Sequence, residues 1–229
     1  MRSKKVCVKM ALDSVLRAFV NNWELARRIA KFIALIGISP NLLSLLSFGC
    51  AMLAGLFFFF AGNSPYFNYR NFNLLLFLAG VFVCLNALLD ALDGVLARET
   101  GNASKKGDFL DHVIDRYSDV FVIGGIILGG YVNPRWEIGL VAIIGVLLSS
   151  YMGTQAQAVG LSRVYGGLIG RADRLLIIIV ATFLSLIYPY PIPASGPLSF
   201  SFLGWTLVLF AILCNATALQ RFFYAWRRI

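Results

Sequence analysis

Six of the eleven acidic residues in this sequence are aspartates that fall within thirty consecutive positions. They are Asp90, Asp93, Asp108, Asp111, Asp115 and Asp119. Two pairs, at positions 90 and 93 and at positions 111 and 115, have spacings of three and four residues, so each pair shares one face of a helix. Hard divalent cations bind carboxylate oxygens, and two such ions about 3.5–4 Å apart can clamp the oxygens of a displacement at phosphorus. The spacing therefore favours a metal site for phosphoryl chemistry.

The chain before these aspartates is so apolar that it should lie in lipid. Residues 73–89 read NLLLFLAGVFVCLNALL. An Asp near the centre of a transmembrane helix costs about 2.5–3.5 kcal/mol, so four of them cost on the order of 10 kcal/mol without compensation. Ion pairs with Arg98, Lys105 and Arg116 are one source of compensation, but these basic residues are fewer than the facing carboxylates. Divalent cations are therefore the favoured source.

Small residues accompany the aspartates on both helix faces. Gly94 and Ala97 lie on the face of the first pair, and Gly107 lies on the face of the second. Their short side chains let a bulky ligand approach the backbone, although in isolation such residues more often indicate close helix packing. Arg98, one position further, can form a forked contact with a diphosphate.

The composition indicates a membrane protein. Hydrophobic residues make up 59% of the 229 positions, and charged residues make up 14%, against about 25% in a soluble domain. Six apolar runs are near or above the length of about 20 residues that a membrane-spanning helix needs. They cover residues 41–61, 73–98, 109–131, 136–159, 174–190 and 199–222. We expect an all-α integral membrane protein in which residues 1–229 form one domain, with a six-helix transmembrane bundle over 41–222.

Residues 12–36 precede this bundle and differ from it in character. Apolar residues fall on one helical face and charged residues on the other, which predicts a basic amphipathic helix in the membrane interface. A packed cytosolic helix is the alternative. Residues 1–40 hold eight Lys and Arg, and residues 98–106 and 160–174 hold three each. By the positive-inside rule, both termini and the aspartate site are cytoplasmic in a multi-pass cell-membrane protein. The net charge of +9 indicates attraction to anionic lipids, and no nucleic-acid partner is expected.

The segment from Asp90 to Asp115 resembles a family signature. It reads DALDGVLARETGNASKKGDFLDHVID and fits D-x2-D-G-x2-A-R-x8-G-x3-D-x3-D at every fixed position. This pattern is similar to that of the CDP-alcohol phosphotransferases, also called the CDP-alcohol phosphatidyltransferase family. The resemblance implies a membrane transferase of phospholipid biosynthesis. Such an enzyme moves a lipid phosphoryl group from a CDP-lipid donor to a polar alcohol acceptor and releases CMP.

The resemblance also implies roles for individual residues. Two divalent metal ions, Mg²⁺ or Mn²⁺, would be held by Asp90, Asp93, Asp111 and Asp115. Asp115 would also take the proton from the acceptor hydroxyl. Contacts to the CDP-lipid would come from Asn41, Gly94, Ala97, Arg98, Ser104 and Gly107. The family further implies a homodimer, and it leaves open whether the donor carries diacylglycerol or archaeol.

The residues after the last motif aspartate bear on the acceptor. DHVIDRYSD, at 111–119, looks more like the inositol-phosphate branch of the family than like the glycerol-phosphate branch, where DPVADK is common. An acceptor phosphate needs cations, and the candidates are Arg116, Arg163, Arg171 and Arg174. Inositol 1-phosphate is the expected acceptor; glycerol 3-phosphate or another polar alcohol is the alternative. Gly153 and Gln155 depart from the branch, which carries Lys and Arg there.

Two other classes of function compete with a transferase. Intramembrane carboxylates also mark cation transporters, but these place their site near the bilayer midplane with broken helices. Here the aspartates cluster at the end of a span. A non-catalytic membrane scaffold is the third possibility, and the intact signature spacing argues against it. His112, the single histidine, lies about 100° away from Asp111 around a helix, which favours packing over proton transfer.

Overall fold

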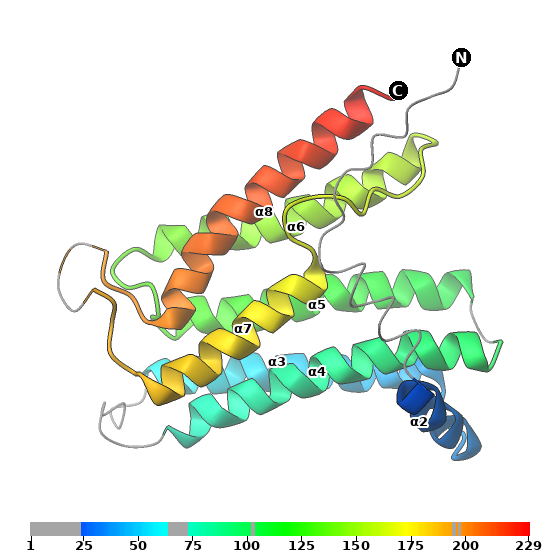
Figure 1. The fold of residues 1–229 in the computed structure, drawn as a ribbon, viewed down its shortest axis with the longest axis horizontal. Helices are drawn as coiled ribbons and strands as arrows, with labels where there is room; N and C mark the ends of the chain where they lie inside the picture. The colour runs from blue at the N-terminus through cyan, green and yellow to red at the C-terminus, as the bar shows by residue number, and fades with distance from the viewer. Residues whose placement is uncertain (1–23, 64–72, 102–103, 194–195, 197) are drawn as a thin grey trace.

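The computed structural model describes residues 24–63, 73–101, 104–193, 196 and 198–229, and over these residues the chain is helical (Figure 1). The helices are α2 (Glu24–Leu35), α3 (Pro40–Asn63), α4 (Leu74–Glu99), α5 (Lys105–Leu128), α6 (Trp136–Ala158), α7 (Arg171–Ile187) and α8 (Phe202–Trp226). One isolated antiparallel bridge joins Ile192 to Phe200 in the connection between α7 and α8. The predicted all-α class is confirmed.

The six helices from α3 to α8 follow the six predicted apolar runs in order, with ends that shift by a few residues. Four of them, α3, α4, α6 and α8, are long and apolar enough to cross a membrane. The other two fall short for different reasons: α5 carries several charged side chains along its first half, and α7 has only 17 residues. The structure therefore establishes four candidate spans, and six spans stay a prediction.

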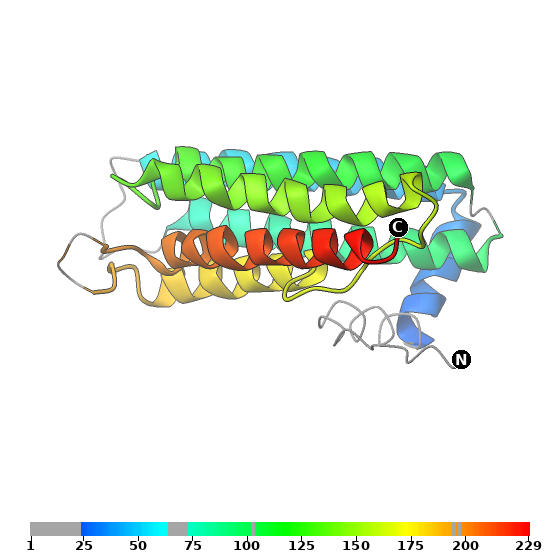
Figure 2. The same cartoon turned by 90° about the horizontal axis from the view of Figure 1, so that it is seen from above.

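The long helices run side by side along the length of the molecule (Figures 1 and 2). Helix α3 packs against both α4 and α5, α6 packs against α8, and α7 packs against α4 and α8. Small residues allow the closest of these approaches. A Cβ atom at Gly55 of α3 would overlap the backbone oxygen of Phe121 of α5, and one at Gly125 would overlap that of Gly55. Glycine at these positions lets the two backbones touch.

Apolar side chains and polar side chains separate along the bundle. Phe58, Phe210 and Leu203 belong to a large buried core that also includes side chains of every long helix. The cluster of aspartates lies toward the end where the connection between α4 and α5 turns, which Figure 1 shows on the right. Helix α7 begins partway along the bundle, because it has 17 residues where α3, α4 and α5 have 24 to 26. The bundle is therefore open beside the aspartates.

Helix α2 covers the latter part of the predicted interfacial segment, and residues 12–23 lie outside the described residues. Its buried side chains are Ala26 and Ala30, and it packs against α4. Arg27 and Lys31 lie 3.6 and 3.9 Å from the carboxylate of Glu99 at the end of α4. Phe32, Leu35 and Ile36 are exposed. Helix α2 crosses the end of the bundle (Figure 2), and its place in the membrane interface stays a prediction.

Candidate active site

A cavity of about 630 Å³ lies at the open end of the bundle, lined by residues of α3, α4, α5 and α7, by the ends of α6 and α8, and by the segment between α6 and α7. All fourteen residues that the sequence analysis assigned to metal, donor or acceptor binding line it. They are Asn41, Asp90, Asp93, Gly94, Ala97, Arg98, Ser104, Gly107, Asp111, Asp115, Arg116, Arg163, Arg171 and Arg174. The fold thus brings the proposed metal, donor and acceptor residues into one place.

The four motif aspartates converge in two overlapping groups. Ligand oxygens of Asp90, Asp93 and Asp111 all lie within 4.8 Å of one another, and so do ligand atoms of Asp111, His112 and Asp115. Asp111 therefore belongs to both groups. The donors are mainly carboxylate oxygens, which suit Mg²⁺ or Mn²⁺ better than thiolate- or imidazole-seeking metals. The residues present fit a divalent cation.

Helix α3 holds Asp93 in place. The hydroxyl of Ser44 donates a hydrogen bond of 2.7 Å to the Asp93 carboxylate, and both side chains are buried. About two turns further into the bundle, the Asn86 amide donates to the backbone oxygen of Ser47 at 3.0 Å and to its hydroxyl at 2.8 Å. These contacts fix the register of α4 against α3. Sequence analysis missed Ser44, whose only signal is its place one turn after Asn41.

The predicted donor-binding residues meet where α5 begins. The Ser104 hydroxyl accepts a hydrogen bond of 3.1 Å from the backbone N–H of Gly107, which caps the helix. A Cβ atom at Gly107 would lie 3.3 Å from both the Ser104 hydroxyl and the Asn41 side-chain oxygen. At Gly94 a Cβ atom would lie 3.5 Å from the Arg98 guanidinium. The glycines thus leave these polar groups at the cavity surface.

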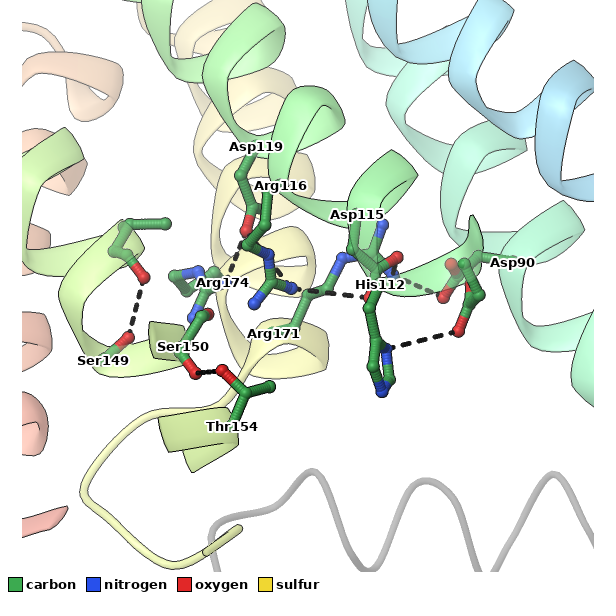
Figure 3. Close-up of polar contacts among 12 residues, drawn as sticks. Asp90, His112, Asp115, Arg116, Asp119, Ser149, Ser150, Thr154, Arg171 and Arg174 are labelled. Carbon is green, nitrogen blue, oxygen red and sulfur yellow. Dashed lines mark hydrogen bonds and ion pairs between the residues drawn. The ribbon is translucent and has the colours of Figure 1, made fainter. Parts of the chain in front are cut away.

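Arg171 lies between the two helices that carry the aspartates (Figure 3). Its Nη1 is 2.6 Å from a carboxylate oxygen of Asp90 and 2.8 Å from one of Asp115. Its Nε and Nη2 are buried and have no hydrogen-bond partner among the described residues. A residue expected at the acceptor phosphate therefore also neutralises two of the expected metal ligands.

A buried ion pair lies one turn deeper. Arg174 donates to the Asp119 carboxylate at 2.7 Å, with side chains only 3% and 4% exposed. The Arg116 guanidinium lies 3.4 Å from Asp115 and 3.9 Å from Asp119 (Figure 3). Because a carboxylate and a guanidinium are each expensive to bury alone, the pair fixes both groups. Asp119 was not among the predicted site residues, although it ends the DRYSD segment.

The segment between α6 and α7 supplies a further cation. The Arg163 guanidinium contacts the His112 ring nitrogen Nε2 and lies 5.0 Å from the centre of the Tyr165 ring. His112 is also 3.4 Å from Asp108. His112 therefore takes part in a polar contact on the cavity wall, where packing was expected. Gln155, at a position where a basic residue was expected, is exposed on α6 and does not line the cavity.

This fold and cavity define a membrane protein whose site combines carboxylates suited to divalent metals with guanidinium groups suited to phosphate. Comparison with known proteins assigns the family. A family model described as CDP-alcohol phosphatidyltransferase matches residues 37–221. The chain therefore belongs to the CDP-alcohol phosphatidyltransferase family.

Curated relatives agree with this assignment. An archaetidylinositol phosphate synthase from Pyrococcus horikoshii is 35% identical over 202 residues, which cover 88% of this chain and 91% of the relative. An archaetidylinositol phosphate synthase from Methanothermobacter thermautotrophicus is 31% identical over 145 residues, covering 63% and 67%. A phosphatidylinositol phosphate synthase from Streptomyces avermitilis is 27% identical over 189 residues, covering 81% and 72%.

Solved structures give the same result. The phosphatidylinositol phosphate synthase of Mycobacterium tuberculosis in complex with manganese and citrate has a TM-score of 0.70 and 26% identity, with 88% of each chain covered. The same enzyme with CDP-DAG bound also has a TM-score of 0.70, covering 89% of this chain and 94% of that one. The predicted family and the predicted enzyme class, a transferase of phospholipid synthesis, are confirmed, and the expected divalent-metal cofactor agrees with these findings.

Proposed function

We propose that this chain transfers a lipid phosphoryl group from a CDP-lipid to inositol 1-phosphate and releases CMP. The observation that carries the proposal is the convergence, in one cavity, of the four motif aspartates and four arginines. The first set suits a metal-bound diphosphate and the second suits a phosphate monoester, which carries about −1.5 to −2 charges near neutral pH. The names of the relatives support the same acceptor.

The acceptor side rests on the arginines that carry unpartnered donors. Nε and Nη2 of Arg171 and Nε of Arg174 are buried without a hydrogen-bond partner among the described residues. Such donors are costly to bury alone, and an acceptor phosphate would supply the missing oxygens. Arg116 and Arg163 complete the proposed acceptor half. Free inositol has no anionic group for these guanidiniums, and serine has one carboxylate with less negative charge than a phosphate monoester.

The donor side uses residues of α3, of α4 and of the start of α5. Arg98, Ser104 and Asn41 provide polar groups for the CDP moiety, while Gly94, Ala97 and Gly107 leave room for it to approach the helix backbones. Asp90, Asp93, Asp111 and Asp115 would hold two divalent ions. When bound, these ions stabilise the negative charge that develops on the diphosphate. The proposal covers both diacylglycerol and archaeol as the lipid part, because the residues assigned to the donor contact its CDP moiety.

Asp115 is the proposed base. It lies where the two halves meet, with its carboxylate 2.8 Å from Arg171 and 3.4 Å from Arg116. The acceptor hydroxyl oxygen attacks the lipid-linked phosphorus, and its proton passes to the Asp115 carboxylate. The bond from that phosphorus to the CMP oxygen breaks, and CMP leaves with the bonding electron pair. The flanking guanidiniums orient the carboxylate toward the acceptor.

The proposal includes a topology. Six spans, from α3 to α8, would place the cavity at the cytoplasmic end, with both termini on the same side and residues 12–36 along the interface. Residues 98–101, 104–106 and 160–174 and the end of α8, which carry the basic side chains, all lie toward the cavity end of the bundle, which supports this orientation (Figure 1). A homodimer of this chain in the cell membrane is part of the same proposal.

A CMP-release assay tests the proposed function. Purified protein receives either CDP-diacylglycerol or CDP-archaeol, with inositol 1-phosphate, glycerol 3-phosphate, serine or free inositol as acceptor. We expect the highest kcat/KM with inositol 1-phosphate, loss of turnover in EDTA, and recovery with Mg²⁺ or Mn²⁺. An equal kcat/KM with glycerol 3-phosphate would show that the acceptor is wrong, and full turnover in EDTA would show that the metal mechanism is wrong.

A further inference from the structure

The end of the bundle away from the cavity carries a group of aromatic side chains. Helix α7 ends there and α8 begins there, at the left of Figure 1. The centre of the Tyr188 ring lies 5.5 Å from that of Tyr190 and 6.3 Å from that of Phe202. The centre of the Phe200 ring lies 5.7 Å from that of Trp205. Tyr188 and Tyr190 are each 46% exposed and Trp205 is 36% exposed. These five residues are called the aromatic cluster below.

Several backbone polar groups beside the aromatic cluster are paired. Ile192 and Phe200 exchange two backbone hydrogen bonds, of 2.9 and 3.5 Å. The indole N–H of Trp205 donates to the backbone oxygen of Ile192 at 2.7 Å. Prolines occupy three of the positions from 188 to 193, and a proline has no backbone N–H to pair. Because an unpaired backbone group is costly next to hydrocarbon, this arrangement suits contact with a bilayer.

This part of the sequence carries no charge. Residues 175–220 contain no Asp, Glu, Lys, Arg or His. The exposed side chains at this end include Tyr188, Tyr190 and Ile187, the last of which is 81% exposed. Tyr and Trp combine an apolar ring with a polar tip, and they are enriched where the hydrocarbon of a membrane meets the headgroups. An uncharged surface with such side chains fits a lipid surface better than bulk water.

The spacing of two tryptophans along α8 matches the thickness of a bilayer. Trp205 lies in the first turn of α8 and Trp226 is its last residue, so about 31 Å of helix separates them at 1.5 Å per residue. The hydrocarbon core of a bilayer is about 30 Å thick. Trp226 is exposed at the cavity end (Figure 1). Trp136 is exposed at the start of α6, close to the start of α8, because a Cβ atom at Gly204 would overlap the backbone oxygen of Tyr131 just before α6.

We propose that the aromatic cluster binds the headgroup boundary of the leaflet opposite the cavity, and that this contact fixes the depth of the bundle in the bilayer. The partner is a glycerophospholipid surface. The rings pack against the first acyl carbons, and the tyrosine hydroxyls bond to ester and phosphate oxygens. The contact requires α8 to cross the membrane, as its length and hydropathy allow. It is independent of the identity of the acceptor and of the side of the membrane on which the cavity lies.

The depth of the bundle bears on the site. Helix α4 begins at the same end as the aromatic cluster, where the centre of the Phe77 ring lies 6.2 Å from that of Phe183 in α7. Asp90 lies about 24 Å along α4 from its first residue. With the aromatic cluster at one headgroup boundary, the motif aspartates therefore come close to the other boundary, where the phosphorus of a lipid substrate lies.

Depth-dependent fluorescence quenching tests the contact in the full-length protein. In one variant Trp23, Trp136 and Trp226 are replaced by Phe, so that Trp205 is the only tryptophan. The variant is reconstituted in phosphatidylcholine vesicles whose acyl chains carry bromine either near the headgroup or near the chain end. We expect quenching of Trp205 by the shallow bromine to exceed quenching by the deep bromine about twofold or more.

A tryptophan further along the same helix is the matched control. All four native tryptophans are replaced by Phe, and Ile212→Trp is added. Ile212 is 63% exposed and lies about 10 Å further along α8 than Trp205. We expect the reverse order there, with stronger quenching by the deep bromine.

Removal of the two tyrosines tests the role in depth. In a second protein Trp226 is the only tryptophan, Phe keeps a ring at position 205, and Tyr188→Ala and Tyr190→Ala are combined. Without these side chains the bundle can shift along the membrane normal, so the ratio of shallow to deep quenching of Trp226 should change about twofold. Ile187→Ala removes an exposed aliphatic neighbour and should leave the ratio unchanged. Gel filtration and circular dichroism verify that each variant is folded.

Either test can overturn the proposal. Equal or stronger quenching of Trp205 by the deep bromine would overturn the contact with the headgroup boundary, and so would quenching by acrylamide in water with little quenching by either lipid. An unchanged ratio for Trp226 in the double tyrosine variant would overturn the fixing of depth. Neither readout depends on CMP release, so an error in the proposed acceptor would leave both results standing.

Discussion

Charge compensation at the aspartates involves an arginine from a distant helix. Ion pairs with Arg98, Lys105 and Arg116 were the sequence-based alternative to metal ions. The structure instead places Arg171, from the first turn of α7, on Asp90 and Asp115. Opposite charges this close in a partly buried site interact by several kcal/mol at an effective dielectric constant of about 20. A divalent cation bound at these carboxylates would therefore share them with a guanidinium.

This arrangement predicts that removing Arg171 strengthens metal binding. In Arg171→Ala the carboxylates lose a competing positive charge, so the Kd for Mn²⁺, measured by electron paramagnetic resonance of the free ion, should fall about tenfold. Arg171→Lys keeps the charge and should remain near wild type. The KM for the acceptor phosphate should rise in Arg171→Ala at the same time. Unchanged or weaker Mn²⁺ binding in Arg171→Ala would contradict the competition.

Asp115 gives a second prediction at this scale. Asp115→Asn should lower kcat by about 10²–10⁴-fold, because the amide cannot accept the proton of the acceptor hydroxyl. CDP-lipid binding, measured separately, should survive through the other three motif aspartates. Asp108→Asn is the matched control: its side chain is 75% exposed at the edge of the same cavity and it is not in the motif. Wild-type turnover in Asp115→Asn would show that Asp115 is not the base.

At the scale of elements, the sequence predicted the features that depend on the spacing of residues within one helix. The spacing of Asp90, Asp93, Asp111 and Asp115 predicted that their carboxylates would meet, and in the structure all four line one cavity. This prediction was possible because two helices joined by a short connection can pack against each other in only a few ways.

The supporting contacts could not be predicted in the same way. Ser44 with Asp93, Arg174 with Asp119, and Arg221 with the segment 159–170 between α6 and α7 each join parts of the chain that are 49 to 56 residues apart. Periodicity within one helix carries no information on which residue of another helix lies opposite. Helix α7 shows this: it begins at Arg171, three residues before the predicted start at 174, and Arg171 and Arg174 of its first turn pair with Asp115 and Asp119 of α5.

The close approach of α3 and α5 gives a prediction for this scale. Gly125→Ala should destabilise the protein by about 1–3 kcal/mol, because its Cβ would overlap backbone atoms of Gly55, which cannot move as a side chain would. The neighbouring Gly124→Ala is the control, since a Cβ there meets nothing within 4 Å. Unfolding of both variants in detergent measures the difference. Equal stability of the two would mean that the helices can separate without cost.

At the scale of the whole molecule, charge and hydropathy are distributed along one axis. The four candidate spans supply apolar length, while the basic segments gather around the cavity end. Helix α5 carries several charged residues in its first half, where it lines that cavity, and α7, which has 17 residues, begins with residues that line it. Helices α5 and α7, which are too charged or too short to count as candidate spans, are therefore the two helices whose first turns line the site. The charge of α5 and the short length of α7 are therefore weak evidence that these helices do not cross the membrane.

Thiol labelling can decide whether α5 and α7 cross. In a variant whose four native cysteines are replaced, single cysteines are introduced in the connections at Lys105, Arg135, Ser162 and Leu198. These positions are exposed, so a membrane-impermeant thiol reagent applied to intact cells reaches only those outside. Six spans with a cytoplasmic cavity require that Arg135→Cys and Leu198→Cys are labelled at once and that Lys105→Cys and Ser162→Cys are labelled only after permeabilisation. CMP release by each variant verifies its fold. If Lys105→Cys and Arg135→Cys were accessible from the same side, α5 would not span; the same result for Ser162→Cys and Leu198→Cys would exclude α7.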